Sequence, residues 1–234
     1  MVDDNKVNRL LLMRNLELQG HRVASAENGR VALEMQQSGF TLGGKRVRAS
    51  VMFSDIRDFT PLAESQPPEE TIELLNTYYT LMFNAISGHG GIVSLIAGDG
   101  LMAVFGAPLP LPDHCDAAVR TALEMIEMIE LFNVEQADVG KPQIRIGIGI
   151  ASGEMVAGYT GTNERATYTC IGNTVNLASR LETHTKVAEH AILIDGVTRA
   201  GLRGDIKVET LGPIAFRGKA QAVDVFGVDL RQNV

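Results

Sequence analysis

The sequence predicts an α+β protein in which helices cover one face of a single sheet. Three observations predict it: 45% hydrophobic and 21% charged residues, a strand–helix alternation that begins near Arg46, and the order β-α-β-β-α-β within that alternation. That order is the ferredoxin-like arrangement, and extra strands follow it toward the C-terminus. The length of 234 residues suits one domain plus an appendage, since domains average about 150 residues.

The first forty residues differ in character from the rest. Apolar spacing predicts a helix over 5–18, a short strand over 21–25 and a second helix over 29–37. A Gly-Gly pair makes residues 41–45 a flexible linker. So short a segment cannot bury a core of its own, so we expect it to lean on the larger domain that spans 46–230.

The first half of the larger domain shows clear element boundaries. An apolar run predicts a strand over 48–54. A helix is predicted over 67–87, because two prolines and two glutamates stand at its start and a glycine follows its end. The turn Gly-Asp-Gly at 98–100 joins the apolar runs 91–96 and 101–105 into a hairpin.

The second half continues the alternation. A helix is predicted over 112–132, and alternating residues predict a strand over 143–150. We expect a turn at 152–154 that leads into another strand ending at Gly161. The remaining predicted elements are a strand over 168–171, a helix over 173–186, and strands over 191–194 and 223–228.

Composition limits the classes of partner and location. The 21 basic and 28 acidic residues give a net charge of −7, which argues against nucleic-acid binding. Cys115 and Cys170 are too few for a disulfide framework or a four-ligand zinc site, and they favour a reducing, cytoplasmic setting. No apolar run reaches the roughly 18 residues of a membrane span, and the first residues lack a signal-peptide pattern, so we expect no membrane insertion.

Two aspartates are the candidate metal ligands. Asp55 follows an apolar strand, and Asp99 lies at the tip of the hairpin turn. If these strand ends are neighbours, two carboxylates converge in the way that Mg²⁺ requires when substrate phosphates supply the other ligands. Aspartate is common in turns, so either one alone has a structural explanation.

Two further segments carry candidate substrate-binding groups. The turn at 55–60 offers successive backbone N–H groups to phosphate oxygens, although an ordinary strand-to-helix connection explains it equally well. Asn176 and Arg180 are four apart and share one face of a helix, unless they form only a solvated polar stripe. Arg217 and Lys219 place two cations after an apolar strand, where basic turns are common.

Three ordered motifs resemble the signatures of class III adenylate and guanylate cyclase catalytic domains. They are Phe-Ser-Asp-Ile-Arg-Asp-Phe-Thr at 53–60, Gly-Asp-Gly-Leu-Met-Ala-Val-Phe-Gly at 98–106, and Tyr-Thr-Cys-Ile-Gly-Asn-Thr-Val-Asn-Leu-Ala-Ser-Arg-Leu-Glu at 168–182. The resemblance covers residues 46–230. It implies an adenylate cyclase that converts ATP to 3′,5′-cyclic AMP and pyrophosphate, with two Mg²⁺ or Mn²⁺ ions and active sites shared across a homodimer.

The resemblance also implies a role for each matching residue. Asp55 and Asp99 would bind the metal ions, with the backbone of Ile56 beside them. Asn176 and Arg180 would act from the partner subunit, on the ribose and on the charge that develops at the α-phosphoryl group. The residues implied to contact the triphosphate are Ile56, Phe59, Thr60, Lys219 and, as second choice, Arg217.

The base-recognition positions depart from the family pattern. Similar adenylate cyclases have a lysine, and guanylate cyclases usually a glutamate, at the position of Leu95, which can make no hydrogen bond to a purine. Thr169, at the partner position, resembles the bacterial adenylate-cyclase type. We therefore expect ATP cyclisation with relaxed purine selectivity. Asp58 stands where the family often has glycine.

Other interpretations stay open. Leu95 favours a weak or inactive nucleotide-binding or dimerisation module, and a guanylate cyclase is a further alternative. A diguanylate cyclase is disfavoured, because residues 98–101 lack a second acidic residue beside Asp99. Residues 1–40 resemble part of a response-regulator receiver domain, with Asp3 and Asp4 as its acidic pair, and they end before any phosphoacceptor strand.

Overall fold

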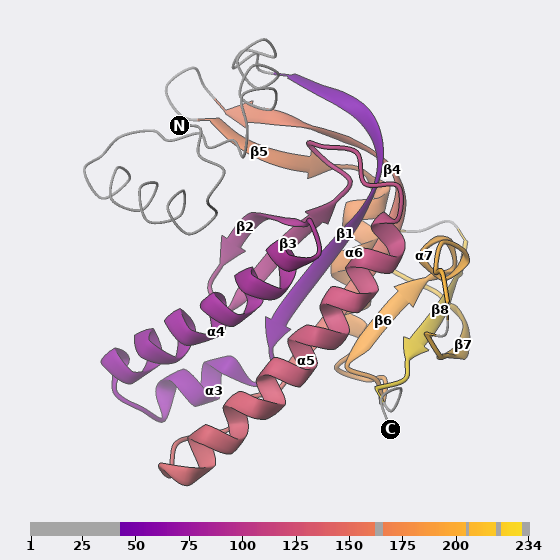
Figure 1. The fold of residues 1–234 in the computed structure, drawn as a ribbon. Helices are drawn as coiled ribbons and strands as arrows, with labels where there is room; N and C mark the ends of the chain where they lie inside the picture. Colours follow the sequence, from indigo (N-terminus) through magenta and orange to yellow (C-terminus); the bar gives the residue numbers. More distant parts are fainter. Residues whose placement is uncertain (1–42, 162–165, 205, 219–220, 231–234) are drawn as a thin grey trace. The chain divides into compact units, whose positions relative to one another are not determined.

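The structure is a computed structural model, and it describes residues 43–161, 166–204, 206–218 and 221–230. The receiver-like segment predicted at 1–40 lies outside these residues. The described chain forms an α+β domain with one eight-stranded sheet (Figure 1). The predicted fold class is therefore confirmed.

The N-terminal half of the domain forms the ferredoxin-like unit. Its elements are β1 (Gly43–Ile56), the short α3 (Phe59–Glu64), α4 (Pro68–Gly88), β2 (Ile92–Ala97), β3 (Gly100–Phe105), α5 (His114–Asp138) and β4 (Ile146–Gly161). In the sheet these strands lie in the order β2-β3-β1-β4, and β3 is antiparallel to both β1 and β2. The predicted order β-α-β-β-α-β is thus the observed one.

The C-terminal half extends the sheet beyond β4. It comprises β5 (Ala166–Ile171), α6 (Asn173–His184), β6 (Ile192–Asp195), α7 (Gly196–Ala200), β7 (Val208–Ile214) and β8 (Val223–Val228). The sheet continues from β4 through β6 and β8 to β7, with β6 parallel to β4, while β5 pairs with β4 off this path. These are the extra C-terminal strands that the sequence predicts.

The helices do not all lie on one face of the sheet. Side chains of α4 and α5 share a buried cluster with Met52 and Ile56 of β1, and the two helices cross the same face in Figure 1. Buried residues of α6 share a second cluster with Ala49 and Val51, which point to the opposite face because side chains alternate along a strand. The prediction of a one-sided helical layer holds for α4 and α5 and is wrong for α6.

Two glycines of β4 explain how α6 reaches the second face. A Cβ atom on Gly149 would lie 2.0 Å from the backbone nitrogen of Glu182, and one on Gly147 would lie 1.2 Å from a guanidinium nitrogen of Arg57. Any larger residue would hold the helix away from the strand. The alternation of isoleucine and glycine at 146–150 therefore places a full core on one face and a close helix contact on the other.

Two local boundaries differ from prediction. β1 begins at Gly43, inside the predicted linker 41–45. β4 runs unbroken from Ile146 to Gly161, so the predicted turn at 152–154 is wrong, because Ser152 is buried and its backbone N–H donates to the Asp195 carboxylate.

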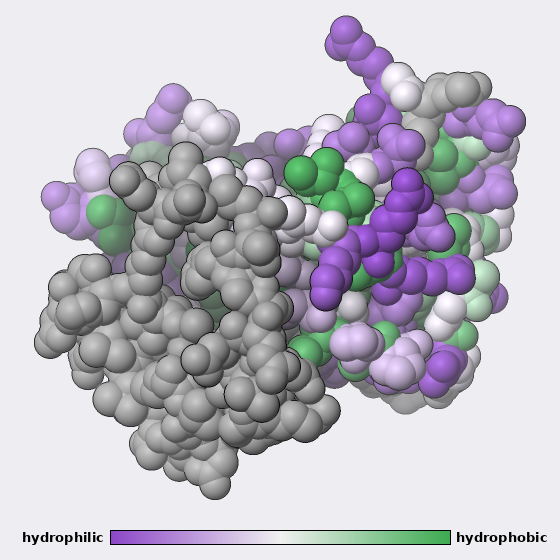
Figure 2. All heavy atoms as spheres, turned by 90° about the horizontal axis from the view of Figure 1, so that it is seen from above, coloured by the Kyte–Doolittle hydropathy of each residue, from purple (hydrophilic) through white to green (hydrophobic). Residues whose placement is uncertain are grey.

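Much of the described surface in the view of Figure 2 is hydrophilic, with limited apolar areas. Among the described helices, none is long and apolar enough to cross a membrane.

Candidate active site

The structure brings the two candidate metal ligands together. Asp55 is the penultimate residue of β1, and Asp99 lies in the turn between β2 and β3. Ser54 pairs with Leu101 across the antiparallel ladder, so the two strand ends are neighbours. A Cβ on Gly100 would lie 3.7 Å from Oδ1 of Asp55, so the Asp55 carboxylate lies against the turn that carries Asp99.

The two carboxylates of this pair disfavour each other's ionisation. Burial, the hydrogen bond to Asp55 and the Asp55 charge together raise the pKa of Asp99 to about 7, although the backbone N–H of Ile56 donates to the same carboxylate. Two close carboxylates that resist ionising together gain most from a bound cation. Within the described residues no group of three or more His, Cys, Asp or Glu side chains forms a metal site, so the protein offers two carboxylates and leaves other ligand positions open.

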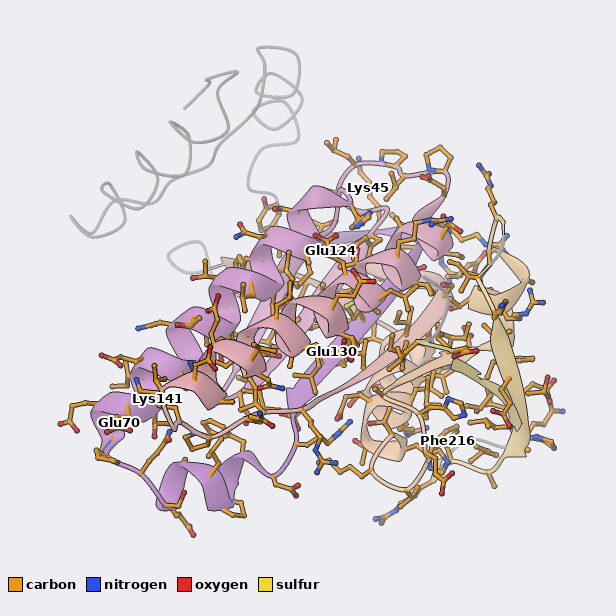
Figure 3. All side chains as sticks on the ribbon, turned by 60° about the horizontal axis from the view of Figure 1, so that its bottom comes forward. Lys45, Glu70, Glu124, Glu130, Lys141 and Phe216 are labelled. Carbon is orange, nitrogen blue, oxygen red and sulfur yellow. The ribbon has the colours of Figure 1, made fainter. Side chains whose placement is uncertain are left out.

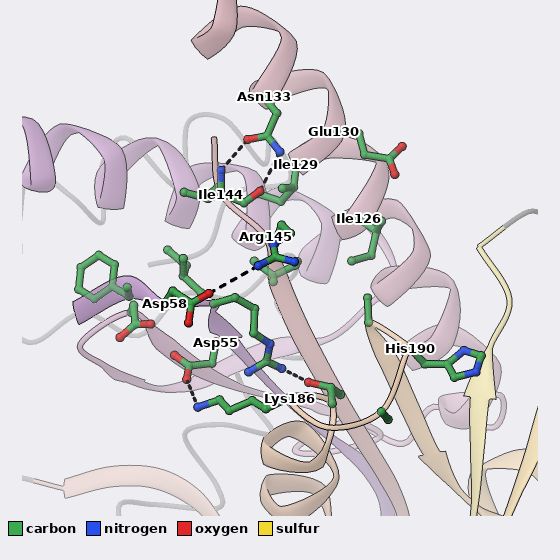
Figure 4. Close-up of a pocket in the computed structure, with 18 of the residues that line it drawn as sticks. Asp55, Asp58, Ile126, Ile129, Glu130, Asn133, Ile144, Arg145, Lys186 and His190 are labelled. Carbon is green, nitrogen blue, oxygen red and sulfur yellow. Dashed lines mark hydrogen bonds and ion pairs between the residues drawn. The ribbon is translucent and has the colours of Figure 1, made fainter. Parts of the chain in front are cut away.

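The Asp55 carboxylate forms an ion pair with Lys186. Nζ of Lys186 lies 3.8 Å from Oδ2 of Asp55, and Figure 4 shows this contact as a dashed line. Lys186 follows the C-terminus of α6 and its side chain is about half exposed. The sequence contains no signal for this contact, because the two residues lie on separate elements.

The loop after β1 is held at several points. The side chain of Ile56 is only 2% exposed, so this residue can face a ligand only through its backbone. Asp58 adopts a left-handed conformation with φ of 55°, which glycine adopts without cost and aspartate more readily than most residues. This backbone accounts for the glycine that the family often has there. The Asp58 carboxylate pairs with Arg145 at 3.5 Å, and both side chains are exposed (Figure 4).

A cavity of about 760 Å³ opens beside this loop. Its lining includes Asp55, Asp99, Phe59, Thr60 and Lys186. A space of this size accommodates a nucleotide-sized ligand. The predicted metal and triphosphate residues of the N-terminal half therefore meet at one place.

The other predicted residues form a second set, and none of those described lines that cavity. Leu95 of β2 is 49% exposed. Its neighbour Ser94 donates a hydrogen bond of 2.8 Å to the carbonyl of Tyr168 in β5, which brings Leu95 and Thr169 to the same region. Asn176 is exposed and Arg180 half-buried on α6.

The segment after β7 lies against α6. A Cβ on Gly218 would lie 3.3 Å from a guanidinium nitrogen of Arg180, so the loop that carries Arg217 is next to that side chain. The ring of Phe216 packs edge-on against His184 of α6, with centroids 5.7 Å apart. Figure 3 shows Phe216 well away from Glu124 and Glu130 of α5. Lys219 lies outside the described residues.

Residues 45–227 match the family described as Adenylate and Guanylate cyclase catalytic domain. The chain belongs to this family. It is 36% identical to Adenylate cyclase 1 of Rhizobium meliloti (strain 1021) over 183 residues, which are 78% of this chain and 28% of that protein. The chain thus spans little more than a quarter of the length of that curated relative.

Solved cyclase domains share the fold over most of this chain. The adenylyl cyclase CyaB from P. aeruginosa superimposes with a TM-score of 0.76 at 32% identity, covering 82% of this chain and all of that one. The guanylyl cyclase Cya2 superimposes with a TM-score of 0.72 at 30% identity, covering 80% and 94%. Both adenylyl and guanylyl cyclases are therefore among the similar structures. The structural similarity is thus compatible with either ATP or GTP as the substrate.

The cyclase domain contains site residues that the sequence motifs do not single out. Tyr79 of α4 donates a hydrogen bond to the carbonyl of Gly98, and burial followed by the charges of Asp99 and Asp55 raises its pKa. This bond holds the turn that carries Asp99. Arg57, which lies inside the first motif, also lines the cavity, and its guanidinium pairs with Glu182 of the third motif.

Proposed function

We propose that this cyclase domain converts ATP to 3′,5′-cyclic AMP and pyrophosphate as a homodimer. The observation that carries the proposal is the pairing of Asp55 with Asp99 at one mouth of the cavity, where burial and mutual repulsion favour a cation. Membership of the cyclase family supports the reaction class. The name of the Rhizobium meliloti relative and the CyaB structure support ATP as the substrate.

A homodimer accounts for the separation of the two sets of residues. Asp55, Asp99 and the loop at 56–60 surround one cavity, whereas Asn176 and Arg180 lie on α6 outside its lining. A twofold axis would bring α6 of each chain to the cavity of the other, and it would complete two identical sites. Each chain would then supply metal ligands to one site and α6 to the other.

The reaction follows from the charges in such a composite site. The ribose 3′-oxygen forms a bond to the α-phosphorus, and the bond between the α-phosphorus and the oxygen that bridges to the β-phosphate breaks. Pyrophosphate leaves, and the 3′-hydroxyl proton passes to solvent. Two Mg²⁺ or Mn²⁺ ions held by Asp55 and Asp99 would lower the pKa of that hydroxyl and neutralise the leaving group. Arg180 would stabilise charge on the α-phosphoryl oxygens, and Asn176 would orient the ribose.

The triphosphate would lie along the loop at 56–60. Phe59 and Thr60 line the cavity, and the backbone of Ile56 faces Asp99. Arg217 is exposed beside Arg180, so it is available to a phosphate at the composite site. We propose the same role for Lys219 from its position in the sequence.

Leu95 is the basis for proposing relaxed purine selectivity. It is half exposed, aliphatic and close to Thr169, so only one of the two base-recognition positions offers a hydrogen bond. One missing hydrogen bond to a base costs about 1–3 kcal/mol of discrimination, or roughly 5- to 150-fold. ATP and GTP should then both react, with ATP preferred.

Product analysis by mass spectrometry tests the reaction and its selectivity together. The protein is incubated with ATP or GTP and Mg²⁺ or Mn²⁺, and cyclic nucleotide and pyrophosphate are measured. Leu95→Lys should raise the ATP-to-GTP ratio of kcat/KM by about tenfold, because the ammonium restores a donor. Ile96→Lys is the matched control, since it adds the same charge to the adjacent residue of β2, which points to the other face.

The outcomes separate the candidate functions. Release of pyrophosphate without a preference change in Leu95→Lys would contradict the explanation of selectivity but leave the cyclase. A product made from GTP alone would identify a guanylate cyclase. No product with either metal, together with nucleotide binding, would identify the nucleotide-binding module that Leu95 also favours.

A further inference from the structure

Arg57 makes a buried contact that the proposed reaction does not use. It follows β1, two residues after Asp55, and its side chain is only 12% exposed. Its Nη1 lies 2.9 Å from Oε1 of Glu182, which is 10% exposed on α6. Its Nη2 donates to the Glu182 carbonyl at 3.2 Å and to the hydroxyl of Thr185. One guanidinium therefore binds α6 at three points near its C-terminal end.

Both residues of the pair have further hydrogen-bond partners. The second carboxylate oxygen of Glu182 accepts from the Thr183 hydroxyl at 3.2 Å, and the Thr185 hydroxyl also donates to the Glu182 carbonyl at 2.7 Å. The backbone N–H of Arg57 donates to the carbonyl of Arg145 at 2.7 Å. Both the side chain and the main chain of Arg57 are thus fixed in place.

Stability alone does not account for this pair. Removing two charges from water costs several kcal/mol, and apolar residues of the same size often stabilise a protein equally well. The fold also omits a side chain at Gly147, where a Cβ atom would overlap the guanidinium. A buried, oriented ion pair in such a space is better suited to fix the relative position of two elements.

The two elements serve different active sites if the proposed function holds. On one side Arg57 is joined to the strand end that carries Asp55 and to the cavity loop. On the other side it binds the helix that carries Asn176 and Arg180. In a homodimer these groups of one chain belong to two different composite sites.

We infer that Arg57 is a positioning residue that ties the two active sites of the dimer together through its ion pair with Glu182. It sets the angle between the metal-binding strand end and α6 within each chain. A displacement of either element is then transmitted to the other, and so from one composite site to its twin. This inference rests on the proposed function for the identity of the two sites.

Metal binding provides a test that does not need turnover. Mn²⁺ alone is titrated into the purified full chain, wild type or Arg57→Met, and bound metal is followed by electron paramagnetic resonance. Loss of the tether should weaken Mn²⁺ binding by about tenfold, the usual effect of removing a group that orients metal ligands. Arg145→Met is the matched control, because it removes the same charge from the same cavity rim at an exposed ion pair, and it should change binding by no more than about twofold.

Mixed dimers test the connection to the second site. Asp55→Asn and Arg180→Ala chains, each inactive alone, should form heterodimers with one complete site, and equal mixing should restore about a quarter of wild-type activity. Arg57→Met is then added to only one chain of the pair. A tether predicts that kcat per complete site falls at least tenfold whichever chain carries it.

The alternatives give other results. A role confined to the cavity loop would lower kcat only when Arg57→Met is on the chain that supplies Asp55 and Asp99. A purely structural role would lower the melting temperature and leave kcat and Mn²⁺ affinity of the folded protein unchanged. Either result overturns the inference. If Arg57→Met does not fold, Glu182→Gln retains the shape of the contact without its charge, and the same outcomes apply.

Failure of the inference and failure of the proposed function are distinguishable. A wild-type chain that makes no cyclic nucleotide, while Arg57→Met still weakens Mn²⁺ binding and loosens hydrogen exchange in α6, would overturn the function and retain the tether. A wild-type chain that makes cyclic nucleotide, together with unchanged Mn²⁺ binding in Arg57→Met, would retain the proposed function and overturn the tether.

Discussion

Replacing Asp99 by asparagine should stabilise the metal-free domain while weakening its metal site. The side chain keeps its shape, but the repulsion from Asp55 disappears. In the unfolded chain this carboxyl titrates at its ordinary value of 3.8, whereas burial and Asp55 raise the pKa to about 7 in the folded protein. Between these values the folded state binds more protons than the unfolded state, so the stability of the wild type falls as the pH rises from about 4 to about 7.

The size of this effect can be bounded. A rise from 3.8 to about 7 corresponds to roughly 4 kcal/mol, at about 1.4 kcal/mol for each pH unit. Asp99 is partly exposed at the cavity, and solvent screening reduces this to about 1–2 kcal/mol. Asp99→Asn should therefore melt about 3–6 °C above the wild type at pH 8 and at nearly the same temperature at pH 4.

Thermal unfolding in EDTA at several pH values measures this difference. Asp224→Asn removes an exposed carboxylate of β8 outside the cavity and is the control. Added Mn²⁺ should raise the melting temperature of the wild type and have little effect on Asp99→Asn. If Asp99→Asn were no more stable than the wild type at pH 8 in EDTA, the raised pKa of Asp99 that burial and Asp55 produce would be refuted.

Two further substitutions test other contacts of the site. Lys186→Met should tighten Mn²⁺ binding by about two- to fivefold, because the ammonium 3.8 Å from Asp55 competes with the metal. Weaker Mn²⁺ binding in this variant would show instead that Lys186 supports the site. The control is Lys141→Met, which removes a lysine from an exposed ion pair with Glu73. Gly149→Ala should lower the free energy of unfolding by about 2–4 kcal/mol, because its Cβ would displace the backbone of α6. Urea titration measures this, and Gly88→Ala, where a Cβ meets nothing within 4 Å, should be nearly neutral. Equal stability of the two glycine variants would contradict the close packing of α6.

The local motifs determined much of the fold and of the site. Apolar periodicity located the long helices α4 and α5, and the turn Gly98–Gly100 joined β2 to β3 as expected. The hairpin rule placed Asp99 in the turn between β2 and β3. The sequence predicted that Asp55 and Asp99 meet only if the end of β1 lies beside this turn, and the ladder between β1 and β3 fulfils that condition. The position of Asp58, often glycine in this family, is explained by its positive φ.

Long-range packing was decided by the tertiary structure alone. Arg57 and Glu182 lie 125 residues apart, and each is an ordinary charged residue in its own motif. Their contact depends on Gly147 and Gly149, which let α6 approach the face of β4 opposite α4 and α5. Periodicity shows that a helix has an apolar face but not which side of a sheet receives it, because that choice follows from the space that distant residues leave free.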